Sequence, residues 1–369
     1  MNFHNDSDKH VLSLLFLIIF IFVYMGKFKY LAVYISPLLA LISFNLSGVF
    51  AYTGLFTLYL LIPILENILP KNSYNMSKEE KEKAKNDHFY DVILYLMVPL
   101  HFYVIYIFLI NINNPILPTS DLVAYILMMG TVLGVNGING GHELGHKINN
   151  PLKLFLAHLL LTSSLQNHFM TYHNSGHHRD VGTPNDLTSA KKDDVFYWFA
   201  LKSQIGGYFK TWKLEGEKLK ARSKSRLFNP MIIYTILPWS FLGVIYLSFG
   251  FEVTLFYFVA SIFGISVLEG QNYFSHYGLR RKKKVDGTYE NVKAIHSWNS
   301  DHLFSRLILF ELTRHSDHHH LGAKPFQILD SRQESPMLPF GYPAMLILSY
   351  LPFLFIPIMN KQLKAYNID

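Results

Sequence analysis

Long apolar segments constrain the fold of this chain more than any other feature of its sequence. Half of its 369 residues are hydrophobic and only 16% are charged, against roughly a quarter in soluble proteins. A bilayer-crossing helix needs about 20 mostly apolar residues. Six segments approach that length with their uncharged flanks, at 31–44, 49–69, 89–110, 122–135, 231–249 and 253–267. The sequence therefore predicts an all-α integral membrane protein with six transmembrane helices.

Lysine and arginine are concentrated on one side of these segments. The loops at 71–85, 191–226 and 280–284 are rich in basic residues, whereas the stretch 86–146 contains no lysine or arginine. Because basic residues are retained on the cytoplasmic side of a membrane, we expect three hairpins whose large polar segments, 141–228 and 276–340, form a cytoplasmic cap. The net charge of +7 is explained by this topology. No basic stripe interleaved with stacking aromatics is present, so we expect no nucleic-acid partner.

Three further segments do not fit the pattern of full spans. The apolar stretch at 11–24 is short and could form an extra N-terminal hydrophobic helix within an extension, residues 1–27, of uncertain role. The stretch at 152–165 is interpreted as an interfacial or re-entrant helix. The charged segment at 77–85 is interpreted as a solvated helical connection. Residues 1–369 are taken as a single membrane domain.

Histidines form four clusters in the expected cap, and they are the candidate metal ligands. The chain has no cysteine, so any metal must be held by His, Asp, Glu or backbone groups. Imidazole suits Fe, Cu, Zn and Ni. The nine clustered histidines are His142, His146, His173, His177, His178, His276, His315, His318 and His319.

The spacing of these histidines favours two metal ions. Residues three or four apart share a helix face, so His142 with His146, His173 with His177, and His315 with His318 or His319 could each bind one ion. The second histidine of each adjacent doublet lies about 100° further around the helix and cannot comfortably reach the same ion. Nine imidazoles exceed what one ion accepts but suit two ions with four or five each.

Polar residues near the clusters are candidates for orienting the imidazoles. These candidates are Glu143, Asp186, Asn272, Asp301 and Asp317. We favour Asp186 and Asp317 among them. The remaining histidines are interpreted as structural, except for the ambiguous His168 and His320; the structural ones are His4, His10, His88, His101, His158, His296 and His302.

The string HELGH at 142–146 allows another interpretation, because H-E-x-x-H is also the zinc-binding motif of metalloproteases. At a membrane boundary it would indicate a zinc-dependent intramembrane protease. The additional histidine arrays weigh against this, since a protease needs only one further ligand.

Five strings together resemble the motifs of membrane-bound alkane 1-monooxygenases. These are NGGHELGHK, HNSGHHRDVGTPND, NYFSHYGLRR, HSWNSDH and RHSDHHH, and the resemblance runs from about residue 29 to 343. That family comprises integral-membrane di-iron hydroxylases related to xylene monooxygenase and, more distantly, to fatty-acid desaturases. The resemblance implies that the nine histidines bind two non-haem iron ions. It also implies O2-dependent hydroxylation of the terminal carbon of n-alkanes to 1-alkanols.

The same resemblance implies partners and a location. Electrons would come from a separate rubredoxin and its reductase, since the chain has neither cysteine nor a nucleotide-binding glycine motif. The basic loops at 191–226 and 280–284 could steer an acidic rubredoxin. Hydrocarbon would enter from the lipid of a bacterial-type inner membrane, with the active site facing the cytoplasm.

Three departures from the family pattern leave the substrate open. Tyr172 stands where the family usually has Glu, and Glu269, Gly270 and Gln271 stand where small or hydroxyl residues are commoner. After the last histidine cluster the chain reads HLGAKPFQIL in place of the usual small residue, Pro and Arg-rich run. A fatty-acyl desaturase or hydroxylase and a xylene-type methyl monooxygenase therefore remain as alternatives, and substrate chain length is not fixed.

Overall fold

The computed structural model describes residues 25–368, and the regular secondary structure of this part of the chain is helical. The β-structure of these residues consists of two isolated β-bridges, Lys283–Tyr289 and Asn299–Met337. The predicted all-α class is thus confirmed for residues 25–368, while the apolar stretch at 11–24 lies outside them. The elements in chain order are η1 (Gly26–Tyr34), α2 (Ile35–Ser43), η2 (Gly48–Tyr52), α3 (Thr53–Phe56), η3 (Thr57–Leu61), α4 (Ile62–Ile68), α5 (Lys78–Lys85), α6 (Phe89–Ile112), α7 (Thr119–Val132), η4 (Leu133–Ile138), α8 (Asn139–Gly145), α9 (Pro151–Ser163), α10 (Phe169–Tyr172), η5 (His173–His177), α11 (His178–Asp180), α12 (Phe196–Ala221), η6 (Arg226–Phe228), α13 (Met231–His276), η7 (Ala294–His296), α14 (Leu303–Ile308), α15 (His315–His320), η8 (Phe326–Ile328), α16 (Tyr342–Ser349) and α17 (Pro352–Ala365).

Four helical stretches among the described residues are long and apolar enough to cross a membrane. They are Gly48–Ile68, Phe89–Ile112, Thr119–Gly145 and Met231–His276. The first joins η2, α3, η3 and α4 end to end, and the third joins α7, η4 and α8. The protein is therefore a multi-pass membrane protein.

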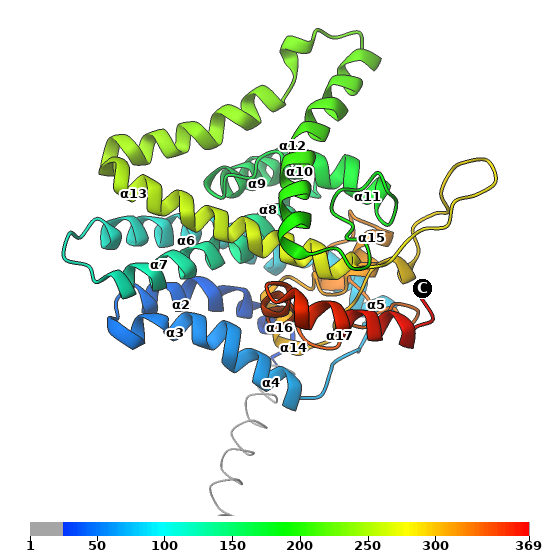
Figure 1. The fold of residues 1–369 in the computed structure, drawn as a ribbon, viewed down its shortest axis with the longest axis horizontal. Helices are drawn as coiled ribbons and strands as arrows, with labels where there is room; N and C mark the ends of the chain where they lie inside the picture. The colour runs from blue at the N-terminus through cyan, green and yellow to red at the C-terminus, as the bar shows by residue number, and fades with distance from the viewer. Residues whose placement is uncertain (1–24, 369) are drawn as a thin grey trace, which may run out of the picture.

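Helix α13 contains both of the apolar segments predicted at 231–249 and 253–267. Its 46 residues continue through Gly250, whose backbone is not helical and has φ 84° and ψ −175°. Only glycine adopts this conformation without strain. The resulting bend turns the chain back, so that the two arms of α13 diverge from it in a V (Figure 1).

The predicted span at 31–44 is helical but divided, with η1 ending at Tyr34 and α2 beginning at Ile35. Pro37 lies in the first turn of α2. A proline has no N–H to donate to the carbonyl four residues earlier, which here belongs to Val33. That carbonyl instead accepts a hydrogen bond of 3.0 Å from the side chain of Asn136 in η4. The interruption of the helix is thus compensated by a neighbouring element.

Helices α7 and α13 approach each other closely because both carry glycine at the contact. A Cβ added at Gly130 would lie 2.5 Å from the carbonyl oxygen of Ala260, and one at Gly264 would lie 2.8 Å from that of Gly130. This contact joins the stretch that leads to α8 with the arm that ends at His276.

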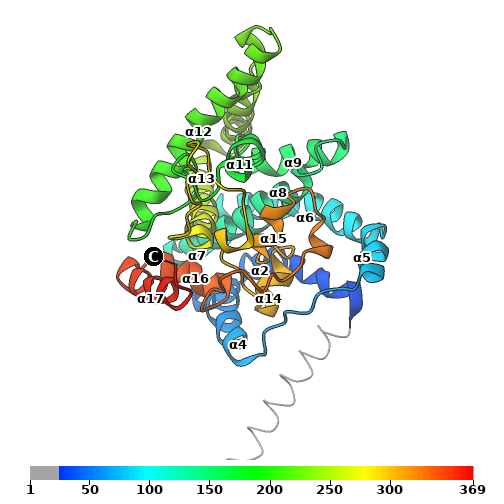
Figure 2. The same cartoon turned by 90° about the vertical axis from the view of Figure 1, so that its right-hand side faces the viewer.

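The apolar helices have two distinct ends. In Figure 1 the α6–α7 turn, the α2–α3 turn and the bend of α13 lie together at one end, and α5, α11 and α15 lie at the other. The view along the molecule from that second end shows α15 near its centre (Figure 2). Helices α16 and α17, which the sequence did not lead us to expect, pack there on the end of α13 through Tyr273, Met345 and Phe355. Helix α5 forms as predicted and begins with a capping box between Ser77 and Glu80.

Candidate metal centre

Four separate segments bring the clustered histidines together at the second end of the bundle. His142 lies on α8, which follows the π-helical segment η4, and His146 ends that helix. His173 and His177 lie in a second π-helical segment, η5, and His178 begins α11. The last four are His276 at the end of α13 and His315, His318 and His319 on α15. Short π-helical segments inside helices are frequent at functional sites.

Close helix packing positions the first pair. A Cβ added at Gly141 would lie 2.8 Å from the Cγ atom of Leu161, so α8 could not pack this closely on α9 with a larger residue there.

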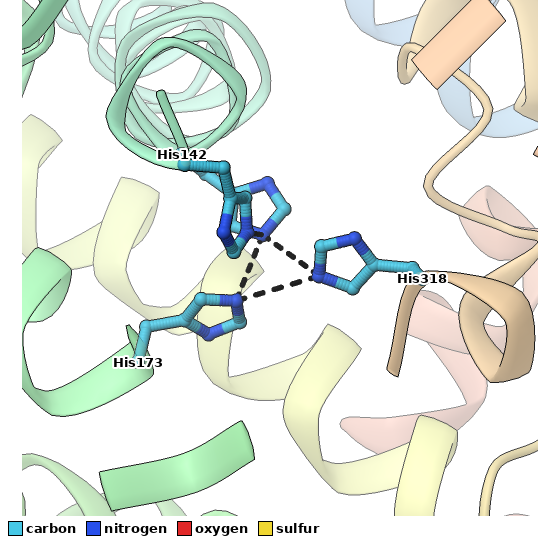
Figure 3. A group of neighbouring side chains, drawn as sticks. His142, His173 and His318 are labelled. Carbon is cyan, nitrogen blue, oxygen red and sulfur yellow. Dashed lines mark hydrogen bonds between the residues drawn. The ribbon is translucent and has the colours of Figure 1, made fainter. Parts of the chain in front are cut away.

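One group of four imidazoles consists of His142, His146, His173 and His318, all buried. The Nε2 atom of His142 lies 2.9 Å from that of His173, 3.2 Å from that of His318 and 2.9 Å from that of His146. Figure 3 shows that the rings of His142, His173 and His318 point their nitrogen atoms at a common region from different elements.

A second group consists of His177, His276, His315 and His319, also buried. The Nε2 atom of His315 lies 2.9 Å from that of His276 and 3.1 Å from that of His319. His177 completes the group, with its Nε2 atom 3.2 Å from that of His319.

His178, the ninth histidine, lies between the two groups. Its Nε2 atom is 3.0 Å from that of His173 in the first group, and its ring centroid is 4.5 Å from that of His319 in the second. It can therefore contribute to either group without belonging to one alone.

The two groups of imidazoles do not match all of the histidine pairs that the sequence spacing predicted. His142 and His146 share a group, as do His315 and His319, but His173 and His177 are in different groups. Residues four apart are separated by about 6 Å along a helix, so they share an ion only when their rings converge. The Nε2 atoms of His142 and His146 lie 2.9 Å apart, whereas those of His173 and His177 face different partners, His142 and His319. The inference from the doublets is confirmed for His318 and His319, which are in different groups.

The donor geometry fits metal coordination. Nitrogen ligands at about 2.1 Å from an ion, the distance typical of zinc, are separated by about 3.0 Å at right angles and about 3.4 Å at tetrahedral angles. The closest Nε2 separations within the two groups are 2.9 to 3.2 Å. Each group could therefore hold one ion.

The protonation state of the imidazole rings also suits metal binding. Burial, reinforced by neighbouring imidazoles, lowers the pKa values of five histidines outside the membrane-spanning stretches well below the usual range; these are His173, His178, His315, His318 and His319. They are neutral at physiological pH, which is the form that binds metals.

Two of the rings are fixed by hydrogen bonds from Nδ1, which leave the Nε2 lone pair facing the group. The Nδ1 atom of His276 lies 3.1 Å from the carbonyl oxygen of His296, to which it donates. The Nδ1 atom of His177 lies 2.9 Å from a carboxylate oxygen of Asp186. Such partners set both the tautomer and the ring orientation of a metal ligand.

Asp186 is held as an ionised acceptor. Tyr172, Thr188 and Ser189 donate hydrogen bonds to it at 3.0, 2.8 and 2.5 Å. Burial alone would raise the pKa of this carboxyl, but His177 and the hydroxyl donors together hold it below its usual value. Tyr172, the residue that departs from the family pattern, thus supports a candidate ligand indirectly. Thr188 and Ser189 were not anticipated, because short polar residues in a loop carry no distinctive spacing.

Among residues 25–368, the hydrogen bonds found for the other four polar candidates go to residues other than the nine clustered histidines. Asp317 accepts from Lys324 and Arg332. Asp301 accepts from Ser331, Asn272 donates to Glu269, and Glu143 accepts from the backbone N–H of Phe326. These contacts fix the segments that carry the histidines. Of the five candidates, Asp186 is the one whose hydrogen bond to a clustered histidine is found among residues 25–368.

The rings of the remaining described histidines lie outside the two groups, although His296 contacts His276 through its backbone carbonyl. His320, ambiguous from its position, is exposed beside the buried His319, and His168 contacts the ring of Tyr208. His101, His158 and His302 pair with Ser163, Asn167 and Ser300. His88 is exposed, and His4 and His10 lie outside the described residues.

A largely apolar cavity opens onto both groups. His142, His173 and His315 form part of its wall. The rest of the wall is mainly aliphatic and aromatic and comes from η3, α4, α7, η4, α10, α13, α14 and α16. It includes Leu58, Ile62, Val135, Ile138, Phe169, Val267, Leu268, Phe274, Ile308, Leu309 and Leu346. The imidazoles thus border a space suited to an apolar molecule.

We predict that Asp186→Asn weakens metal retention. An amide has only one acceptor oxygen, so it cannot accept from His177 at one position and from Tyr172 and Thr188 at the other. Losing such a partner typically costs about 10- to 100-fold in metal affinity. The measurement is metal content per chain after competition with a chelator. Asp301→Asn is the matched control and should retain metal like the unaltered protein; equal retention by both variants would contradict the prediction.

Comparison with known proteins agrees with this geometry. The fatty acid desaturase family model matches residues 120–348. Alkane 1-monooxygenase 1 of Alcanivorax borkumensis is 33% identical over 339 residues, which cover 90% of this chain and 82% of that protein. An alkane 1-monooxygenase of Pseudomonas putida is 33% identical over 321 residues, covering 85% and 78%. The hydroxylase component of a xylene/toluene monooxygenase of Pseudomonas putida is 25% identical over 348 residues, covering 93% and 90%.

The motifs, the two histidine groups and these similarities over most of the chain agree: the protein belongs to the alkane 1-monooxygenase family of fatty acid desaturase-like membrane enzymes.

Proposed function

We propose that this enzyme hydroxylates the terminal carbon of n-alkanes with O2, at two iron ions held by the nine clustered histidines. The observation that carries the proposal is the apolar cavity whose wall includes imidazoles of both groups. A terminal alkyl C–H bond offers no polar group for a general acid, base or nucleophile. The protein can therefore contribute only ligands, exclusion of water and positioning.

The cavity wall suits such a substrate because its polar side chains are paired. The hydroxyl groups of Tyr59 and Thr131 lie 3.1 Å apart, and Ser305 donates to Glu66 at 3.0 Å. A hydrocarbon in the cavity would therefore displace little bound water, and apolar contact alone would orient its end toward the imidazoles.

The ligand sets follow the two groups. His142, His146, His173 and His318 would hold one iron ion, and His177, His276, His315 and His319 the other, with His178 available between them. Bound iron would supply the oxidising chemistry with O2. Asp186 would keep the Nδ1 proton of His177 in place, and the carbonyl of His296 would do the same for His276.

We also propose six transmembrane segments, with the histidines on the cytoplasmic side of an inner membrane. The two arms of α13 would count as two spans, and η1 with α2 would provide another. The basic loops at 71–85 and 280–284 support this orientation through the retention of positive charge in the cytoplasm. The protease interpretation of HELGH is set aside, because His142 and His146 share their group with two further histidines and the chain belongs to a monooxygenase family.

The electron donor is proposed to be a separate, acidic rubredoxin that docks on the basic hairpin at 280–290. Lys282, Lys283 and Lys284 are exposed on it. Its base is tied to the loop that follows His178, since the backbone N–H of Arg281 donates to the carbonyl of Gly182 at 2.9 Å and its side chain donates to that of Arg179. A docked carrier would therefore lie next to the segment that bears His177 and His178.

The first test compares two adjacent histidines. With rubredoxin and its reductase supplied, cells carrying the protein should convert n-octane to 1-octanol, His319→Ala should lose iron and turnover, and His320→Ala should keep both. His319 is buried in a group and His320 is exposed. Gas chromatography and iron analysis give the two readouts. Full iron loading without any 1-alkanol from n-octane or n-hexadecane would refute the proposed substrate.

The second test concerns chain length. Val135 lines the cavity and lies seven residues before His142, about 10 Å along a helix. Val135→Phe should fill that part of the cavity and lower turnover of n-hexadecane several-fold more than turnover of n-octane. Val123→Phe, at an exposed position on the same helix, is the control. An unchanged ratio of the two rates in Val135→Phe would contradict this use of the cavity.

The third test concerns electron delivery. Replacing Lys282, Lys283 and Lys284 with Gln should slow reduction by rubredoxin about tenfold at low salt, because steering by charge accelerates association, and the difference should shrink as salt rises. Stopped-flow absorbance measures the rate. The same change at the exposed Lys83, Lys361 and Lys364 should have little effect. A loss of equal size in both triple variants would argue against docking at the hairpin.

A further inference from the structure

Helix α12 (Phe196–Ala221) has two apolar faces, and the protein covers one of them. The covered face includes Phe196, Phe199, Ser203, Gly207 and Leu214. The other face carries large side chains that are strongly exposed: Trp198 at 75%, Leu201 at 54%, Ile205 at 58% and Phe209 at 65%. Exposed apolar residues gathered on one surface indicate a binding partner or a membrane.

The spacing of these residues makes a continuous stripe. At about 100° per residue, Trp198, Leu201, Ile205 and Phe209 fall within a sector of about 80°. Three exposed lysines, Lys202, Lys213 and Lys220, lie along one border of this stripe. An apolar stripe with aromatic residues and a lysine border is the pattern of a helix that lies in a membrane interface.

The position of α12 places this stripe next to the membrane-spanning part of the protein. Figure 2 shows α12 along the outer edge of the molecule, leading directly into α13. In the intervening turn Leu227 and Phe228 are exposed, and in the first arm of α13 Ile233, Ile236 and Trp239 are exposed too. Because α13 is a membrane-spanning stretch, the apolar surface of α12 is continuous with a surface that faces lipid.

We propose that α12 lies in the bilayer interface, with its stripe among the acyl chains and its lysine border at the phosphates of anionic phospholipids. Lysine side chains can extend from an apolar stem to the headgroup region, and anionic lipid attracts such basic residues. Tryptophan is favoured at the same depth.

Anchoring α12 in the membrane interface would also hold part of the metal centre in position. From the covered face of α12, Lys210 donates to Asp180 at 2.9 Å and Gln204 donates to Glu269. Gly207 lies against Tyr172, whose ring would be 3.7 Å from an added Cβ. The lipid interface would thus hold α12 against the segment that carries His173, His177 and His178.

The chain lends itself to a direct test because it contains no cysteine. Single cysteines at Leu201, Ile205, Lys202 and Lys213 would carry nitroxide labels in the otherwise unaltered protein, reconstituted in phosphatidylglycerol–phosphatidylcholine vesicles. Collision with O2, which concentrates in lipid, is compared with collision with a water-soluble nickel chelate. Val285→Cys, on the exposed tip of the 280–290 hairpin, is the aqueous control, and iron content reports that each variant is intact.

The labels at 201 and 205 should collide with O2 several-fold more than with the nickel chelate, and the labels at 202 and 213 should fall between them and the control at 285. Strong nickel collision at 201 and 205 would place the stripe in water and overturn the proposal. Weak collision with both reagents would also overturn it, because the stripe would then be covered by protein, such as a second copy of the chain.

The lysine border is tested with the label kept at 205. Replacing Lys202, Lys213 and Lys220 with Gln should reduce the depth of that label in vesicles with phosphatidylglycerol more than in vesicles of phosphatidylcholine alone. An equal change in both kinds of vesicle would exclude the anionic phosphates as the partner of the lysines.

Discussion

The convergence of nine imidazoles is the constraint on which the rest of this structure depends. Eight of them are buried in two groups of four, and they come from four segments spread over 178 residues, from His142 to His319. Buried polar rings are costly unless they are bonded or coordinated. Separations of 2.9 to 3.2 Å between ring nitrogen atoms are favourable when a cation lies between them. Metal binding would therefore contribute directly to folding, since the site exists only when all four segments are in place.

A separate set of ion pairs holds the segment with the last three histidines. Glu311 accepts from Arg306 at 2.7 Å and from Tyr30 at 2.9 Å, and Arg314 lies 3.5 Å from the same carboxylate. Burial alone would raise the pKa of Glu311, but the two arginines lower it to about 2, so the network stays ionised at neutral pH. Immediately after this network, α15 begins at His315, and Asp317 on α15 pairs with Lys324 and Arg332. Buried ion pairs give little net stability, but removing one partner leaves the other charge buried and unpaired. The pairs around Glu311 and Asp317 therefore restrict where α15 can lie.

The sequence predicted the composition of this centre better than its internal division. Nine histidines and two metals follow from spacing and from the HH doublets, and the structure gathers those nine. The partition of His173 and His177 between groups could not be predicted, because it depends on how η5 crosses α8 and α15. Asp186 was predicted from its position beside a cluster, but Thr188 and Ser189, which hold it, have no pattern of their own. The divided helix at 26–43 and the bent α13 follow from Pro37 and Gly250 only once the neighbouring elements are known.

The centre has two faces of opposite character, and this follows from which elements meet there. On one side His142, His173 and His315 border the apolar cavity formed by α7, η4, α13 and α14. On the other side His173 and His177 border a small polar cavity with Gln204, Glu269 and Asn272, closed by α12. Polar side chains make up much of the lining of the second cavity, and mainly apolar side chains line the first. The proposed hydroxylation consumes protons and takes an apolar substrate, so the two sides would suit its two requirements. Because His173 belongs to both walls, the segment 173–178 separates them, and its attachment to α12 through Lys210 and Asp180 helps to hold that separation in place.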